Sequence, residues 1–260
     1  MQRVVITGAG HGLGAALARR FADAGAAVAL LDLDHEAATA RAGELTARGA
    51  QCLALRCDVT SLESCREAIS AVTAAFGGID VLVNNAGITH VGLVRDTDVD
   101  VLRRVVEVNF FGAASCTSAA LPELLRARGH VVAISSVAGF APLANRAGYV
   151  ASKHALQGFF ETLRAEHAAD GLRVSLACPS FVRTGIGDRA LAADGGAAGH
   201  DARTGAGHEV EPDEAARVIH AGIEAGRRMI FVGREARLAW WVTRFWPRLY
   251  ERMMIRRTMR

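Results

Sequence analysis

The sequence predicts a single α/β domain built on a doubly wound parallel sheet of about seven strands, with helices on both faces. Short apolar runs alternate with amphipathic helical patterns, and a glycine-rich turn follows the first run. The chain has 260 residues, of which 51% are hydrophobic and 22% charged. This length and composition suit one large core. They exclude a disordered chain, a fibrous repeat and a disulfide-stapled miniprotein.

Seven runs are predicted to be strands because they are apolar along most of their length. Strands of this kind are buried on both faces, as in a parallel sheet that helices cover on each side. The predicted strands are residues 3–7, 26–33, 51–59, 81–87, 130–136, 173–180 and 228–233.

Helices are expected between these runs. The first follows the glycine-rich turn and has Leu13, Leu17 and Phe21 on one face. The others are predicted near residues 36–48, 62–76, 98–127, 148–169 and 212–226.

The predicted catalytic domain covers residues 1–233, and one segment inside it is irregular. Residues 185–210 are rich in Gly and Ala and show weak apolar periodicity. Long loops within compact domains are often functional, so we predict a mobile lid over an active site, with a plain linker as the alternative.

Positive charge is concentrated at the C-terminal end. Residues 234–260 contain eight Arg and two Glu, a net charge of +6, whereas the whole chain is +3 and residues 1–233 therefore sum to −3. The predicted domain thus offers no broad basic face for nucleic acid. Five cysteines without a C-x-x-C pair, no leader-like start and no run of 18 apolar residues favour a reduced, cytoplasmic setting.

The glycine-rich turn TGAGHGLG (7–14) lies between a predicted strand and a predicted helix. This context favours binding of a dinucleotide pyrophosphate at the helix N-terminus over an ordinary helix-capping turn. Asp32 lies 24 residues after Gly8, at the end of the second predicted strand. Its carboxylate can accept hydrogen bonds from the adenosine ribose and would repel a 2′-phosphate. Because none of the next three residues is a fixed cation, NAD is expected rather than NADP.

The counts of lysine and tyrosine point to a second site. Of 30 basic residues, 29 are Arg and Lys153 is the single lysine, and the only tyrosines are Tyr149 and Tyr250. Lys153 follows Tyr149 by four residues, hence on the same helix face. An adjacent ammonium would lower the tyrosine pKa from about 10. Tyr149 is therefore the predicted general acid/base.

The motifs TGAGHGLG, NNAG (84–87), ISSVAG (134–139) and YVASK (149–153) resemble the short-chain dehydrogenase/reductase family in its single-domain form. The resemblance covers nearly all of residues 3–233. It implies a Rossmann-like fold, a nicotinamide dinucleotide cofactor and a homodimer or homotetramer. It also implies hydride transfer between nicotinamide and a carbinol carbon.

The same resemblance implies four catalytic residues. Tyr149 exchanges the substrate proton, and Lys153 supports it while holding the nicotinamide ribose. Ser136 would orient the substrate and hydrogen-bond the carbonyl oxygen, with Ser135 as the nearest rival. Asn109 would help to hold a water that links the lysine to solvent.

The resemblance further implies a set of cofactor contacts at the carboxyl ends of the strands. In the PSFVRT segment, Ser180 stands where the family usually has Gly, which makes that backbone less permissive. The expected contacts are Gly8, Gly10, His11, Gly12, Leu13, Gly14, Asp32, Asp58, Val59, Asn85, Ala86, Gly87, Tyr149, Lys153, Pro179, Val182 and Thr184.

The expected substrate pocket is mostly apolar, which favours a hydrophobic secondary alcohol or ketone. Its predicted lining is His90, Phe140, Leu143, Phe181 and Ile186, and no metal site is predicted. Two other classes of function remain as alternatives: a non-catalytic dinucleotide-binding regulator and a membrane-surface interaction protein.

Residues 234–260 form a basic amphipathic extension that contains all three tryptophans. Its apolar residues fall at helical spacing with Arg around them and a break at Pro247. Trp and Arg together suit an interface with anionic lipids. Packing on a neighbouring subunit or over the substrate mouth is the alternative, so peripheral membrane association is one of two expectations for this extension.

Overall fold

In the computed structural model, which describes residues 1–198 and 209–258, seven strands form one parallel sheet. The order is β3-β2-β1-β4-β5-β6-β9, so the predicted doubly wound α/β fold is confirmed. The strands are β1 (Arg3–Thr7), β2 (Ala27–Asp32), β3 (Cys52–Arg56), β4 (Val81–Asn84), β5 (His130–Ile134), β6 (Arg173–Pro179) and β9 (Met229–Val232).

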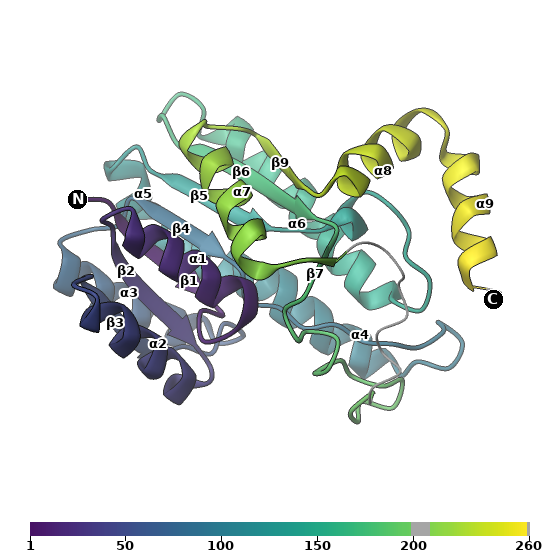
Figure 1. Ribbon diagram of the computed structural model, residues 1–260, viewed down its shortest axis with the longest axis horizontal. Helices are drawn as coiled ribbons and strands as arrows, with labels where there is room; N and C mark the ends of the chain where they lie inside the picture. Colours follow the sequence, from purple (N-terminus) through teal and green to yellow (C-terminus); the bar gives the residue numbers. More distant parts are fainter. Residues whose placement is uncertain (199–208, 259–260) are drawn as a thin grey trace.

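Helices cover both faces of the sheet, and each face has its own buried apolar cluster (Figure 1). One cluster joins the sheet to α1 (Gly12–Asp23), α2 (His35–Ala47) and α7 (Pro212–Glu224). The other joins it to α3 (Leu62–Phe76), α5 (Gly112–Arg126) and α6 (Ala147–Glu166). The strands are apolar on both sides because both sides are covered.

The helix predicted over 98–127 is divided. It consists of α4 (Val99–Val106), a π-helical turn at Glu107–Phe111, and α5. A π turn inserts one residue into the helical repeat, and such insertions are frequent at functional sites.

The order of the strands reverses between β1 and β4, because β2 pairs with one side of β1 and β4 with the other. Ligands of doubly wound sheets bind at this switch point, outside the carboxyl ends of the strands. The chain segments that follow β1, β2, β3, β4, β5 and β6 therefore converge on one edge of the sheet.

Two short strands absent from the sequence prediction lie beside this edge. β7 (Phe181–Val182) pairs in parallel with β8 (Glu209–Val210). In the described part of the predicted lid, Leu191 bonds to the loop after β4: Leu191 N donates to Thr89 O at 2.9 Å, and Val91 N donates to Leu191 O at 2.8 Å. Residues 199–208 of that lid lie outside the described residues.

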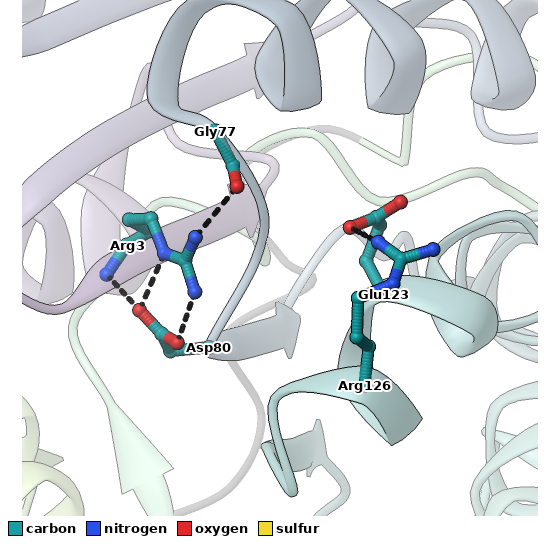
Figure 2. A network of polar contacts seen from close by, with 5 residues as sticks. All are labelled: Arg3, Gly77, Asp80, Glu123 and Arg126. Atoms are coloured by element: carbon teal, nitrogen blue, oxygen red, sulfur yellow. Dashed lines mark hydrogen bonds and ion pairs between the residues drawn. The ribbon is translucent and has the colours of Figure 1, made fainter.

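At the opposite end of the sheet, Arg3 and Asp80 form an ion pair, shown in Figure 2. The Arg3 guanidinium donates to both oxygens of Asp80, at 2.8 and 2.6 Å, and to Gly77 O at 2.8 Å. The nearby pair of Arg126 and Glu123 lies within one turn of α5. Hydrogen bonds from Arg3 hold the pKa of Asp80 below its usual range. This contact ties the start of β1 to the loop that precedes β4.

The C-terminal extension forms an arm of two helices, α8 (Arg234–Phe245) and α9 (Pro247–Thr258), which projects from the body (Figure 1). The predicted break is present, since α9 begins at Pro247. The arm is attached where Ala236 is fully buried and where the Trp240 ring lies 6.0 Å from that of Phe231 on β9.

Candidate active site

The glycine-rich turn joins β1 to α1 in a shape that larger residues would disrupt. Gly8 has a φ of +64°, which L side chains rarely adopt. A Cβ on Gly14 would lie 2.0 Å from Gly8 O and 2.6 Å from the Asn85 side-chain nitrogen. The first turn of α1 therefore lies directly against the backbone of the loop, with its N-terminal amides at the edge of the sheet.

Asn85 and Thr7 hold this turn to the loop after β4. The Asn85 amide donates to Thr7 O and Gly8 O, both at 2.9 Å. The Thr7 hydroxyl accepts from the backbone amides of Asn85 and Ala86, both at 3.0 Å. The side chain of Asn85 thus positions the turn, while its backbone remains at the edge of the site.

Asp32 ends β2 and also braces the loop. One carboxylate oxygen accepts from Gly10 N at 2.8 Å and the other accepts from Asp34 N at 3.0 Å. These two bonds fix the orientation of the carboxylate. Each oxygen retains a second lone pair for an external hydroxyl.

Asn109 lies in the π turn and is 1% exposed. Its carbonyl oxygen accepts from Ile88 N at 2.8 Å, and its amide donates to Ile88 O at 3.0 Å and to Ser152 Oγ at 2.9 Å. Ser152 in turn donates to Tyr149 O at 2.7 Å. Asn109 therefore joins the loop after β4 to the helix that carries Tyr149. The predicted role in holding a water stays a prediction.

Ser136 and Ser135 follow β5 and point to different partners. Ser136 has an extended backbone, and its hydroxyl accepts from Ala138 N at 3.2 Å while also contacting Tyr149. Ser135 is buried and donates to Lys153 O at 3.5 Å. The hydroxyl of Ser136 is thus the one that meets the tyrosine.

Tyr149 and Lys153 share a face of α6, with Lys153 Nζ 5.6 Å from the centre of the Tyr149 ring. The ammonium donates to Ile134 O at 2.8 Å. Burial lowers the pKa of Lys153 to about 8 and raises the pKa of Tyr149, the latter opposed by the hydrogen bond with Ser136 and by the charge of Arg146. Burial therefore disfavours the charged form of each group, whereas the sequence prediction considered only the attraction between them.

One cavity of about 580 Å³ joins the turn to these residues. Of the predicted cofactor contacts, all but Gly10 and Gly14 line it, together with Ser136 and Ile186. Gly10 lines a second hollow of about 420 Å³ beside the turn. The predicted dinucleotide and proton-transfer residues therefore share one continuous space, of a size that ligand sites commonly have.

Four of the predicted substrate residues do not line this cavity. Phe140 packs edge-on against Phe231, with ring centres 6.2 Å apart. Leu143 is half-buried, and Phe181 is exposed on β7.

His90, the fourth of these residues, is fully buried. Its Nε2 accepts from Gly148 N at 2.9 Å. Burial and the charge of Arg146 lower the pKa of His90, which keeps the imidazole neutral and able to accept. His90 therefore supports the first turn of α6 next to Tyr149.

Arg146 was not predicted, although its position three residues before Tyr149 was a usable signal. It donates to Thr89 Oγ1 at 3.0 Å and to His90 O at 3.3 Å, and its charge lowers the pKa of Tyr149. The cavity also has lining residues that were not among the predicted site residues. They are Leu33, Asp34, Cys57, Thr60, Ile88, Arg104, Val108, Ile134, Ser135, Ser180 and Arg189.

The family model described as short chain dehydrogenase matches residues 2–194. The chain belongs to the short-chain dehydrogenase/reductase family. Curated relatives include Dehydrogenase/reductase SDR family member 7B of Bos taurus, 42% identical over an alignment of 199 residues that covers 74% of this chain. The protein of the same name from Danio rerio is 36% identical over 262 residues, covering 98% of this chain and 84% of the relative.

Two solved structures extend the comparison. A short-chain dehydrogenase/reductase from Burkholderia phymatum in complex with NAD has a TM-score of 0.84 at 27% identity, covering 95% of this chain and 94% of that chain. An alcohol dehydrogenase from Thermococcus sibiricus complexed with 5-hydroxy-NADP has a TM-score of 0.78 at 26% identity, covering 89% of this chain and 96% of that chain. The match to the bovine relative spans 61% of that protein's length. Each of these two neighbours holds a nicotinamide dinucleotide, NAD in one and 5-hydroxy-NADP in the other.

Proposed function

We propose that this chain transfers hydride between NAD and the carbinol carbon of a hydrophobic secondary alcohol or ketone, with Tyr149 as the general acid/base. The observation that carries the proposal is the single cavity that reaches from the glycine-rich turn to Ser136, Tyr149 and Lys153. Pyrophosphate suits the α1 N-terminus, because Gly8, His11, Gly12 and Leu13 all line that cavity. Gly8 and Gly12 also let Ala86 and Thr184 pack directly against the turn, where a Cβ would clash. The residues present thus fit a dinucleotide.

The proposed roles divide between binding and proton transfer. When bound, the nicotinamide ring supplies or accepts the hydride. Tyr149 Oη gives a proton to the substrate oxygen in reduction and takes it in oxidation. Ser136 Oγ holds that same oxygen, and Lys153, with its pKa near 8, provides a positive charge beside the phenol at neutral pH.

NAD is the proposed cofactor because the Asp32 carboxylate lines the cavity beside the glycine-rich turn, where the adenosine ribose is expected. A 2′-phosphate placed there would meet a like charge. Arg189 lines the same cavity, and its charge contributes to lowering the pKa of Asp34. Calorimetric titration of the wild type with NADH and with NADPH is expected to show tighter binding of NADH. The Asp32→Ala variant should lose this preference for NADH. NADPH preference in the wild type would refute the assignment.

The proposed substrate is lipophilic because the cavity that contains Tyr149 is also lined by apolar side chains, among them Ile88, Ile134, Val182 and Ile186. A screen of secondary alcohols and ketones tests this, with Tyr149→Phe as the inactive control and Tyr250→Phe as the matched active control. Absence of turnover with every substrate would favour a non-catalytic dinucleotide-binding regulator.

We also propose that the arm of α8 and α9 contacts an anionic membrane surface. No helix within the described residues is long and apolar enough to span a membrane. Large apolar side chains are instead exposed along the arm beside its arginines: Leu238, Trp241, Phe245, Trp246, Leu249, Met253 and Ile255. Flotation with phosphatidylserine vesicles is expected for the wild type and reduced for the double variant Trp241→Ser/Trp246→Ser. Equal flotation of both would refute the role of the two tryptophans, and absence of wild-type flotation would favour the membrane-free alternative, in which the arm packs on another subunit.

A homodimer or homotetramer is proposed through the faces of α5 and α6. Phe111, at the end of the π turn, is 50% exposed and lies 4.9 Å from the Phe110 ring. Phe110 in turn meets Phe159 of α6. A Phe111→Glu variant that keeps the wild-type mass in light scattering would contradict this surface. A cytoplasmic setting, with peripheral membrane contact through the arm, is the location that these proposals imply.

A further inference from the structure

Three cysteines from separate parts of the chain meet beneath the cavity. Cys57 follows β3, Cys65 lies in the first turn of α3, and Cys116 lies in α5. Their exposed fractions are 2%, 0% and 0%. All three Sγ atoms lie within 4.8 Å of one another, and those of Cys65 and Cys116 are 3.3 Å apart. The packing of α3 on α5 brings them together.

We propose that Cys57, Cys65 and Cys116 form a binding site for a soft divalent metal ion of the zinc type. Sulfur ligands lie about 2.3 Å from Zn²⁺, so two of them around one tetrahedral ion are about 3.8 Å apart. The observed spacing brackets this value, and rotations of the cysteine side chains can supply the remaining adjustment. Thiolates are soft ligands that select zinc and similar ions over Mg²⁺ or Ca²⁺.

The cluster is buried but borders the cavity at one residue. Cys57 is among the lining residues, so the entry path of an ion and the place of a water as fourth tetrahedral ligand are assigned to that side. Among the residues that the structure describes, no fourth cysteine, histidine or carboxylate joins the cluster. A zinc site with three protein ligands and one exchangeable position is the arrangement that the geometry favours.

The metal site and the dinucleotide site share a chain segment. Cys57 directly precedes Asp58 and Val59, which line the cavity and are among the expected cofactor contacts. A ligand that covers Cys57 would close the entry path. This part of the inference rests on the proposed function, whereas metal binding itself does not.

The test is titration of the reduced, metal-free full chain with Cd²⁺, whose thiolate charge-transfer absorbance reports Cd–S bonds. One ion per chain, with the absorbance of three Cd–S bonds and displacement by Zn²⁺, is expected. Cys65→Ala and Cys116→Ala should each lose about a third of the absorbance and more than ~100-fold in affinity. Cys52→Ala is the matched control, because Cys52 is a half-buried cysteine outside the cluster, and it should behave as the wild type.

Thermal unfolding keeps the result interpretable where a variant is less stable. Cd²⁺ should raise the Tm of the wild type and of Cys52→Ala but not that of Cys116→Ala. Full absorbance in Cys116→Ala, or an equal loss in Cys52→Ala, would overturn the site. Adding NADH first should slow Cd²⁺ uptake several-fold. Unchanged uptake despite measured NADH binding would overturn only the shared entry path, and absent NADH binding would count against the proposed function instead.

Discussion

Acid should destabilise the fold through His130, the first residue of β5. Its Nε2 lies 2.8 Å from Ser175 Oγ, and that hydroxyl donates its hydrogen to Arg227 O at 2.6 Å. The Ser175 oxygen must therefore accept, which fixes the proton on Nε2. Nδ1 is buried, with no partner among the described residues. A second proton would thus place a charge in the interior with nothing to receive its hydrogen bond.

The pKa of His130 gives the size of the effect. Burial, with the charges of Arg173 and Arg164, lowers it from 6.5 to about 4. The unfolded chain therefore binds the proton more tightly, so His130 stabilises the fold above pH 6.5 and this stability is lost as the pH falls toward 4. Between pH 7 and pH 5 the loss is about 2 kcal/mol, a large share of a typical folding free energy.

Urea unfolding at pH 7 and pH 5 measures this loss in the wild type and in His130→Leu, with the exposed His154→Leu as control. Contributions of other groups, such as the buried His220, cancel between variants. The free energy of unfolding should fall by about 2 kcal/mol more in the wild type and in His154→Leu than in His130→Leu. An equal fall in all three proteins would refute the reasoning.

Three further changes test the candidate site. Gly14→Ala should lower the free energy of unfolding by ~1–3 kcal/mol or more and abolish NADH binding in calorimetry, because the added Cβ meets the Gly8 backbone. The control Gly43→Ala, which has open space around the added Cβ, should keep both the stability and NADH binding. His90→Leu should leave Gly148 N unsatisfied, cost about 1–3 kcal/mol by urea unfolding and lower kcat more than it changes KM, whereas His90→Asn should restore part of both. Lys153→Met removes a positive charge that lies 5.6 Å from the centre of the Tyr149 ring. At an effective dielectric constant of ~20, the attraction between that charge and a negative charge on Tyr149 is about 3 kcal/mol. Turnover at pH 7 should fall ~100-fold and stay low in Lys153→Arg; wild-type rates in either variant would contradict the role.

The strands were predictable because burial on both faces leaves continuous apolar runs, and all seven lie within the predicted ranges. Helix 98–127 was predicted as one element because apolar periodicity does not reveal a single inserted residue. The π turn that results places Asn109 against Ile88 and Ser152, contacts that depend on three separate segments. The sequence therefore identified Asn109 as a candidate site residue. It did not show that its side chain connects the loop after β4 to α6.

The substrate side of the cavity was the least predictable part. Phe140 was expected there, yet β9 brings Phe231 against it, and sequence periodicity does not fix which distant strand covers a loop. His90 was expected to meet substrate, but the start of α6 offers it an unpaired backbone N–H in the interior. The cysteine cluster was missed for the same reason, since Cys57, Cys65 and Cys116 show no ligand spacing along the chain.

The environment of Tyr149 and Lys153 also bears on the direction of the proposed reaction. Two interacting groups on one helix face lose their protons as a pair, and burial disfavours charge on both. With the pKa of Lys153 near 8, the pair retains both protons at pH 7. Tyr149 is then ready to donate to a carbonyl, whereas oxidation of an alcohol first requires the pair to lose a proton. The same site should therefore favour ketone reduction at neutral pH and gain oxidative activity as the pH rises through 8.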